Sequence, residues 1–131
     1  MDVEALVEAA RTARERAYAP YSGFRMGAAV LTSQGTVLTG SLVENVSLGL
    51  AMCAERVALF SSVAAGERPV TLVLVSPRTD GVVTCPCGAC LQVGLELGGP
   101  ELVVVAVATD GERHRATVRE LVPRGPHKAG T

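Results

Sequence analysis

Two segments anchor the interpretation of this chain: Cys53-Ala54-Glu55-Arg56 and Pro86-Cys87-Gly88-Ala89-Cys90. Cys87 and Cys90 are three residues apart, so on the first turn of a helix both sulfur atoms lie on one side. Cys53 and Glu55 are two residues apart and would diverge by about 200° inside a helix. They can share a site only at a helix N-terminus, where both side chains project beyond its end. Each segment is therefore predicted to begin a helix, with the thiols and the carboxylate converging on one point.

The three thiols predict a zinc site with one Zn²⁺ per chain. Thiolates from Cys53, Cys87 and Cys90 would leave one position of a tetrahedral Zn²⁺ open, which is the arrangement of a catalytic site. Zinc acidifies a water that it binds, and Glu55 is then predicted to be the catalytic residue that moves the protons. The alternative is a closed structural site with Cys85 as fourth ligand. Glu55 argues against it, because a structural site has no use for a neighbouring carboxylate.

Arg56 is predicted to act on the metal ligands. Three thiolates and Zn²⁺ sum to one negative charge, and Arg56 is placed to donate hydrogen bonds to a thiolate sulfur and offset it. The alternative is a solvated surface arginine. His114 and His127 are the only histidines of the chain. Both are expected at the surface and not among the ligands.

Hydrophobic periodicity and turn residues predict an α/β fold. The expected helices cover 2–16, 53–65 and 87–97, the strands 26–32, 36–40, 70–76, 102–108 and 112–116, and a helical turn 117–121. This order predicts a three-layer α/β/α sandwich with a mixed, mostly parallel five-stranded sheet. Residues 1–123 are expected to form a single domain, and residues 124–131 a flexible C-terminal tail.

Composition bounds the function of the 131-residue chain. It is 48% hydrophobic but only 3% aromatic, so small side chains build the core, which favours burial of a face against copies of itself. The net charge of −1 argues against nucleic acid as a partner. Neither a membrane span nor a signal peptide is recognised, so a cytoplasmic location is expected. Three cysteines within six residues suit a metal better than a disulfide framework.

Five ordered segments carry a family resemblance: residues 17–24, 27–29, 43–45, 53–56 and 86–93. Over nearly its full length, the chain resembles the small homotetrameric cytidine deaminases. The resemblance implies an α/β sandwich and four subunits that share active sites. It also implies hydrolytic removal of ammonia from C4 of cytosine in a free nucleoside, a reaction of pyrimidine salvage.

The resemblance assigns substrate contacts by position. Phe24 would pack on the pyrimidine, the backbone N–H of Ala54 would hold the base carbonyl, and Glu44 would bind the ribose hydroxyls. The alternatives are a core aromatic for Phe24 and a solvated loop carboxylate for Glu44. Leu42 stands where the family usually has an Asn that grips the sugar together with Glu44. Other departures are Leu48 in place of an aromatic, Leu91 in place of an Arg, and no Phe after Leu121-Val122-Pro123.

Three functions remain open from the sequence. The first is deamination of cytidine and deoxycytidine with a weakened grip on the sugar, which Glu44 and Phe24 favour. The second is deamination of a different aminopyrimidine compound, such as a modified nucleoside or a blasticidin S-like antibiotic, which Leu42 favours. The third is a non-catalytic, zinc-stabilised homologue, against which Glu55 argues.

Overall fold

The computed structural model describes residues 2–128. Each predicted helix and strand is present, with bounds that differ by one residue at most; a short 3-10 turn, η1, lies in the segment between β2 and α2, for which the sequence predicted no helix. The elements are α1 (Val3–Glu15), β1 (Gly27–Thr32), β2 (Val37–Ser41), η1 (Leu48–Leu50), α2 (Ala54–Ala64), β3 (Pro69–Ser76), α3 (Gly88–Gly98), β4 (Val103–Ala108), β5 (Arg113–Thr117) and α4 (Val118–Leu121).

The five strands form one mixed sheet in the order β2-β1-β3-β4-β5. Within residues 2–128, β3 pairs with β4 in parallel, and the other three pairings are antiparallel. A mixed sheet was predicted, but the expectation that it would be mostly parallel is wrong. The alternation of strands and helices indicated crossovers, and α2 does connect β2 to a strand of the same direction, β3. However, β1 lies between these two strands and runs against both.

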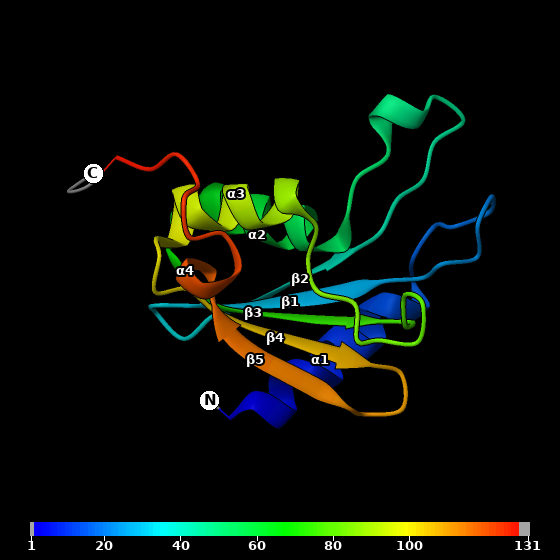
Figure 1. Ribbon diagram of the computed structural model, residues 1–131, viewed down its shortest axis with the longest axis horizontal. Coiled ribbons are helices and arrows are strands. Elements are labelled where there is room, and N and C mark those ends of the chain that lie inside the picture. The colour runs from blue at the N-terminus through cyan, green and yellow to red at the C-terminus, as the bar shows by residue number, and fades with distance from the viewer. Residues whose placement is uncertain (1, 129–131) are drawn as a thin grey trace.

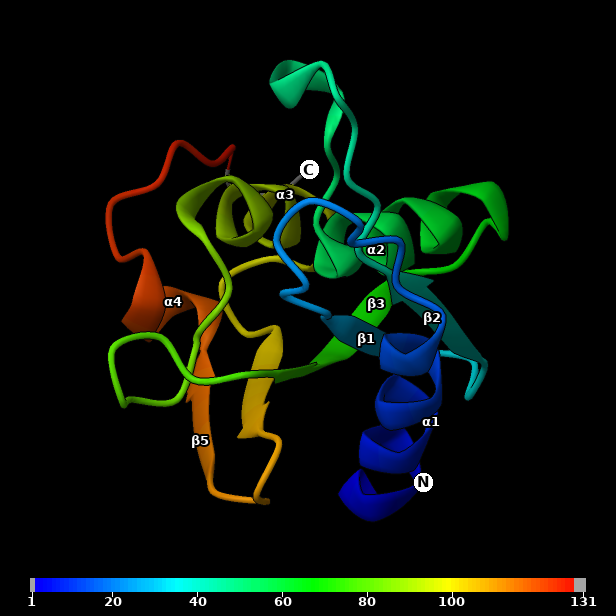
Figure 2. The same cartoon turned by 90° about the vertical axis from the view of Figure 1, so that its right-hand side faces the viewer.

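Helices cover both faces of the sheet and make three layers (Figures 1 and 2). Successive strand residues point to opposite faces, so β3 contributes to two cores. Val73 and Val75 face α1, while Leu72 and Leu74 face α2 and α3. All four are at most 1% exposed. Both cores are built mainly from Val, Leu and Ala, so the predicted three-layer sandwich with few aromatics is confirmed.

Gly40 brings β2 against the first turn of α2. A Cβ atom at this position would overlap the Ala54 carbonyl oxygen and lie 2.6 Å from the Ala58 nitrogen. Only glycine allows this approach. The start of α2 is thereby fixed on the sheet, and the start of α2 is where the candidate site lies.

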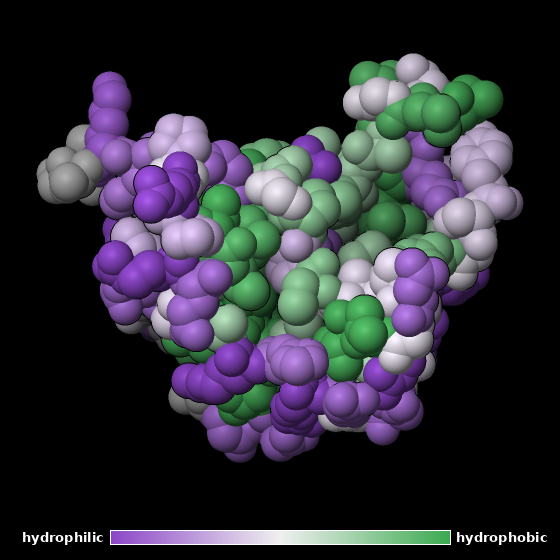
Figure 3. All heavy atoms as spheres, viewed as in Figure 1, coloured by the Kyte–Doolittle hydropathy of each residue, from purple (hydrophilic) through white to green (hydrophobic). Residues whose placement is uncertain are grey.

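An arm of residues 42–53 leaves the end of β2, passes through η1 and returns to α2, projecting from the body of the molecule (Figure 1). Its side chains Val46, Leu48 and Leu50 are 80%, 87% and 68% exposed. Figure 3 shows apolar residues gathered at the end of the arm. Beside its base lies the exposed turn that follows α1, which carries Tyr18 and Tyr21.

The C-terminal residues follow α4, which begins with a capping box between Thr117 and Glu120. Gln92 on α3 donates a hydrogen bond to the carbonyl of Pro126 at 2.8 Å. The flexibility of residues 124–131 stays a prediction, and its last three residues lie outside the described part of the chain. Among residues 2–128, no helix is long and apolar enough to cross a membrane.

Candidate metal centre and active site

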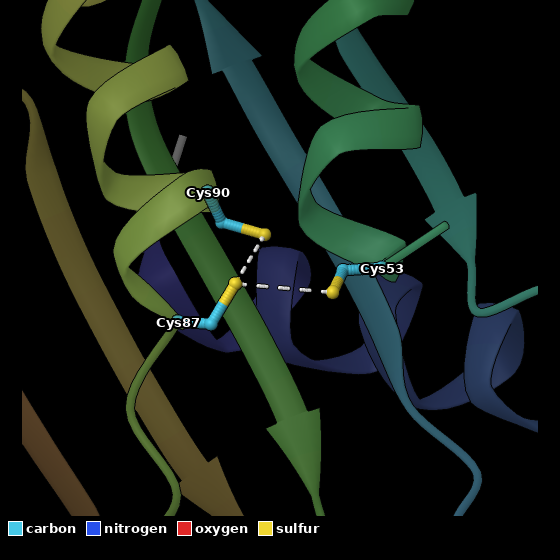
Figure 4. Close-up of side chains that lie close together, drawn as sticks. All are labelled: Cys53, Cys87 and Cys90. Atoms are coloured by element: carbon cyan, nitrogen blue, oxygen red, sulfur yellow. Dashed lines mark hydrogen bonds between the residues drawn. The ribbon is translucent and has the colours of Figure 1, made fainter. Parts of the chain in front are cut away.

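The three cysteines meet where α2 and α3 begin. Cys53 is the N-cap residue of α2 and Cys87 that of α3, while Cys90 lies one turn into α3. The Cys87 sulfur is 4.0 Å from that of Cys53 and 3.5 Å from that of Cys90 (Figure 4). All three sulfurs lie within 4.8 Å of one another. The two segments therefore do converge on one point, as their spacings predict.

This cluster fits a tetrahedral zinc ion. Zn–S bonds of about 2.3 Å place two sulfurs about 3.8 Å apart, and the observed separations lie on either side of that value. Cys90 is buried, Cys53 half-buried and Cys87 exposed, so one side of the cluster is open to solvent. Such an opening is what a catalytic metal needs for a water or substrate ligand.

Cys85 and the two histidines take no part in this cluster. Within residues 2–128, Cys53, Cys87 and Cys90 form the one group of three or more possible metal-ligating side chains. Cys85 is exposed, and the structure does not bring it in as a fourth ligand. His114 and His127 are both exposed, which confirms their prediction as surface residues.

The charge on the cluster is concentrated at Cys53. A hydrogen bond from the Cys90 thiol lowers the pKa of Cys53 to about 5, and hydrogen bonds from Arg56 and Cys87 act in the same direction against the effect of burial. The pKa of Cys90 is raised, because its proton is held by the Cys53 thiolate and its side chain is buried. Nη2 of Arg56 lies 3.5 Å from the Cys53 sulfur, and the thiolate raises the pKa of Arg56. These contacts therefore favour the thiolate form of Cys53.

Glu55 is buried beside this cluster without a partner. Its exposed fraction is 0%, and neither carboxylate oxygen has a hydrogen-bond partner among the described residues. Burial, and to a lesser extent the Cys53 thiolate, raises the pKa of Glu55 to about 7, although the positive charge of Arg56 opposes this. A buried polar group without a partner is costly. Its presence next to a metal cluster is explained if a ligand of the metal supplies the partner.

The fold and this site together define a class, the zinc-dependent deaminases, in which a carboxylate follows the first metal ligand and two further cysteines begin a second helix. Residues 1–106 match the family model described as "Cytidine and deoxycytidylate deaminase zinc-binding region". The chain belongs to this family. It therefore contains the zinc-binding region of the family, and the cluster of Cys53, Cys87 and Cys90 is able to hold the ion.

Known proteins resemble the chain over most of its length. It is 44% identical over 123 residues to a cytidine deaminase of Halalkalibacterium halodurans, covering 94% of this chain and 92% of that one. It is 42% identical to a probable cytidine deaminase of Dictyostelium discoideum, with coverages of 93% and 82%. The crystal structure of cytidine deaminase from Burkholderia pseudomallei superposes with a TM-score of 0.90 at 47% identity, covering 96% of this chain and 100% of that one. That from Mycobacterium tuberculosis gives 0.81 at 38% identity, with coverages of 95% and 97%.

Phe24, Leu42 and Ala54 belong to the core layer between the sheet and the helices α2 and α3. Phe24 and Leu42 are half-buried and pack against the core cluster that contains Ala54. Ala54 is the first residue of α2, and the first N–H groups of a helix have no partner inside it. An aromatic ring, an apolar side chain and a helix N-terminus therefore border the same core layer.

Glu44 lies at the base of the arm, and its carboxylate is engaged within the chain. Oε1 accepts hydrogen bonds from the backbone N–H groups of Tyr21 and Ser22, and Oε2 accepts one from the Ser22 hydroxyl. Sequence reasoning assigned no role to Tyr21 or Ser22, although both lie in one of the segments that carry the family resemblance. The only signal for the contact was the small polar Ser22 in a turn that ends at Phe24.

Proposed function

We propose that this protein is a zinc-dependent hydrolase that converts cytidine and deoxycytidine to uridine and deoxyuridine with release of ammonia. The observation that carries the proposal is Glu55, a fully buried carboxyl without a hydrogen-bond partner beside three convergent thiols. The relatives named cytidine deaminase, which cover more than nine tenths of the chain, favour cytidine over other aminopyrimidines.

In this proposal Cys53, Cys87 and Cys90 hold the zinc ion and Glu55 is the catalytic residue. Bound in this way, zinc supplies Lewis acidity that lowers the pKa of a water molecule toward neutrality. Burial raises the pKa of Glu55 in the metal-free protein, and a raised pKa suits a carboxyl that must both accept and donate protons. Its carboxylate takes up the two protons of the attacking water in turn and delivers the first to the ring nitrogen N3 and the second to the leaving amino nitrogen. The C4–N bond breaks, ammonia leaves, and C4 keeps the oxygen.

Arg56 keeps the first ligand anionic. Three thiolates outweigh the two positive charges of zinc, and the excess negative charge would weaken the acidity of a bound water. The hydrogen bond from Arg56 to Cys53 withdraws part of that charge from the metal. Arg56 therefore acts through Cys53 and does not need to touch the substrate.

In this proposal, four residues position the nucleoside. We assign Phe24 to the face of the pyrimidine and the backbone N–H of Ala54 to the base carbonyl. Glu44 and Leu42 are assigned to the sugar. A carboxylate offers about four lone-pair sites, and Glu44 already accepts three hydrogen bonds. Leu42 is apolar and offers no hydrogen bond. The two side chains assigned to the sugar therefore bind it weakly.

The assembly that we propose is a homotetramer with shared active sites. Large apolar side chains are exposed both on the arm and on α2, where Phe60 and Val63 are 46% and 58% exposed. Burying such surfaces against further copies would complete a core poor in aromatics. Residues 1–123 are proposed to form the domain. A cytoplasmic location and a role in pyrimidine salvage are parts of the same proposal, with a free nucleoside and no nucleic acid polymer as partner.

The test is a panel of substrates given to the zinc-loaded protein. Cytidine, deoxycytidine, cytosine and a blasticidin S-type aminopyrimidine are each incubated with it, and ammonia and the deaminated product are both measured. We expect turnover of cytidine and deoxycytidine well above that of the other two compounds. Zinc-loaded protein that deaminates only the antibiotic-type compound would overturn the substrate assignment and favour the reading that Leu42 suggests.

A further inference from the structure

Glu44, Ser22 and Phe24 are linked in series by hydrogen bonds. The carboxylate of Glu44 accepts from the Tyr21 N–H at 2.9 Å, from the Ser22 N–H at 3.3 Å and from the Ser22 hydroxyl. The same Ser22 oxygen accepts the N–H of Phe24 at 3.0 Å. These contacts, led by the Ser22 hydroxyl, lower the pKa of Glu44, so the carboxylate that holds the turn is ionised at neutral pH. Ser22 thus transmits the position of Glu44 to the backbone of Phe24.

Glu44 itself is anchored next to the metal ligands. Its N–H donates to the Tyr18 carbonyl, and the Tyr18 N–H donates to the Leu42 carbonyl, both at 2.8 Å. The adjacent Val43 exchanges two backbone hydrogen bonds with Met52, at 3.0 and 2.9 Å. Met52 immediately precedes Cys53. Three segments are therefore paired side by side, and the carboxylate of Glu44 projects from a frame that ends at a zinc ligand.

The turn held by this frame has little else at its tip. Tyr21, Ser22 and Gly23 are exposed, and the backbone hydrogen bonds within the turn are those from Gly23 to Ala19 and from Arg25 to Gly23, both at 3.0 Å. Beyond Phe24 the chain is tied to α1, because Arg25 donates to the Glu15 carbonyl at 2.9 Å. The ring of Phe24 packs half-buried against the cluster that contains Ala54. The hydrogen bonds of Glu44 therefore hold the exposed tip of the turn, at Tyr21 and Ser22, while Arg25 already ties the segment after Phe24 to α1.

We propose that Ser22 and Glu44 are positioning residues that hold Phe24 against the core cluster containing Ala54 and thereby set the affinity for the substrate. The consequence for affinity rests on the proposed function, whereas the consequence for the turn does not. A carboxylate that served only to bind a sugar hydroxyl would make no use of Ser22. Under the proposal, Ser22 matters as much as Glu44 for keeping the turn in place, although Ser22 does not itself contact the substrate.

The first experiment compares Ser22→Ala with Ser22→Thr, which keeps the hydroxyl. Hydrogen exchange of the 19–25 segment is followed by mass spectrometry, and KM and kcat are measured with cytidine. We expect Ser22→Ala to speed exchange of this segment and to raise KM on the order of 10-fold with kcat nearly unchanged, since a hydrogen bond to a charged group is lost. Ser22→Thr should restore both. Ser33→Ala, in the exposed turn between β1 and β2, is the matched control and should alter neither.

The second experiment asks whether the two residues act as one unit. Residues that share a single function give non-additive losses, so adding Ser22→Ala to Glu44→Gln should raise KM by much less than Ser22→Ala does alone. Unchanged exchange of 19–25 in Ser22→Ala, failure of Ser22→Thr to restore it, or fully additive losses would each overturn the proposal. If the wild-type protein deaminates no cytidine, the proposed function fails, while the exchange data still decide the positioning role.

Discussion

The guanidinium of Arg56 and the sulfur of Cys53 lie 3.5 Å apart, three residues from each other at the start of α2. This contact helps to make Cys53 a thiolate at neutral pH before any metal arrives. A metal competes with protons for thiolate sulfur. The first turn of one helix therefore carries a metal ligand, the buried carboxyl and the cation that balances the ligand.

Replacing Arg56 should weaken metal binding. Arg56→Gln removes the charge, so the pKa of Cys53 should rise and zinc affinity at pH 6–7 should fall by about 10-fold or more, the usual effect of losing a partner of a metal ligand. Competition with a chromophoric zinc chelator measures the affinity. Arg115→Gln on the exposed face of β5 is the control. An affinity equal to that of the wild type would show that Arg56 does not act on the metal.

Replacing a cysteine of the cluster should reduce the zinc content of the protein, whereas replacing Cys85 should not. Purified wild-type protein and Cys85→Ala should each hold about one Zn²⁺ per chain, because Cys85 is exposed outside the cluster. Cys87→Ala should lose most of the metal and unfold at a lower temperature, since metal-binding energy is also folding energy. Elemental analysis with thermal denaturation checks both. Stoichiometric zinc in Cys87→Ala would remove Cys87 from the ligand set.

Glu55→Gln should abolish most turnover without loss of metal. The amide keeps the size of the side chain but cannot exchange protons, so kcat for cytidine should fall by about 10²-fold or more, on the scale of general acid–base catalysis. Zinc content and thermal stability are measured on the same sample. Glu96→Gln, on an exposed position of α3, should leave kcat unchanged. Near wild-type ammonia release in Glu55→Gln would exclude Glu55 as the proton carrier.

The pH dependence of stability should also report on Glu55. Its pKa is raised from 4.5 to about 7 in the folded, metal-free protein. Because this pKa is raised on folding, protonated Glu55 makes its full contribution to folding stability below about pH 4.5. That contribution is lost as the pH rises through 7. The permanently neutral Glu55→Gln should therefore gain stability over the wild type from pH 5 to pH 8, by up to about 3 kcal/mol. Urea unfolding of chelator-treated proteins across this range tests it; a difference that is independent of pH would contradict it.

Leu42→Asn should strengthen the grip on the sugar. An added hydrogen-bonding group can satisfy a sugar hydroxyl, which is worth roughly 1–3 kcal/mol, so kcat/KM for cytidine and deoxycytidine should rise about 5-fold or more. A dideoxy analogue is the control substrate and should show little change. Because Leu42 packs against the core, zinc content and melting temperature are measured alongside. An unchanged or lower kcat/KM in a folded, zinc-loaded variant would mean that this pocket is built for something other than ribose.

The sequence predicted the metal cluster better than it predicted the sheet. The spacings at 53–55 and 87–90 act within single helical turns, where geometry follows directly from residue number. The direction of β1 depends on where that strand enters the sheet, and local periodicity carries no information about this. The hydrogen bonds of Glu44 to the 21–22 turn span more than twenty residues and join its side chain to two backbone N–H groups and to the Ser22 hydroxyl, which no hydrophobic pattern records. The substrate contacts could therefore be predicted only from the family resemblance, and the contact between Ser22 and Glu44 was not predicted.

The placement of Tyr18 and Tyr21 gives the molecule a built-in optical reporter. The chain has no Trp and only these two Tyr residues, 56% and 62% exposed, in the turn that ends at Phe24. Its ultraviolet emission therefore originates in this turn, while the interior built from Val, Leu and Ala does not emit. Tyrosine fluorescence will follow ligand entry and movements of this turn without any label, and global unfolding will have to be followed by circular dichroism of the backbone.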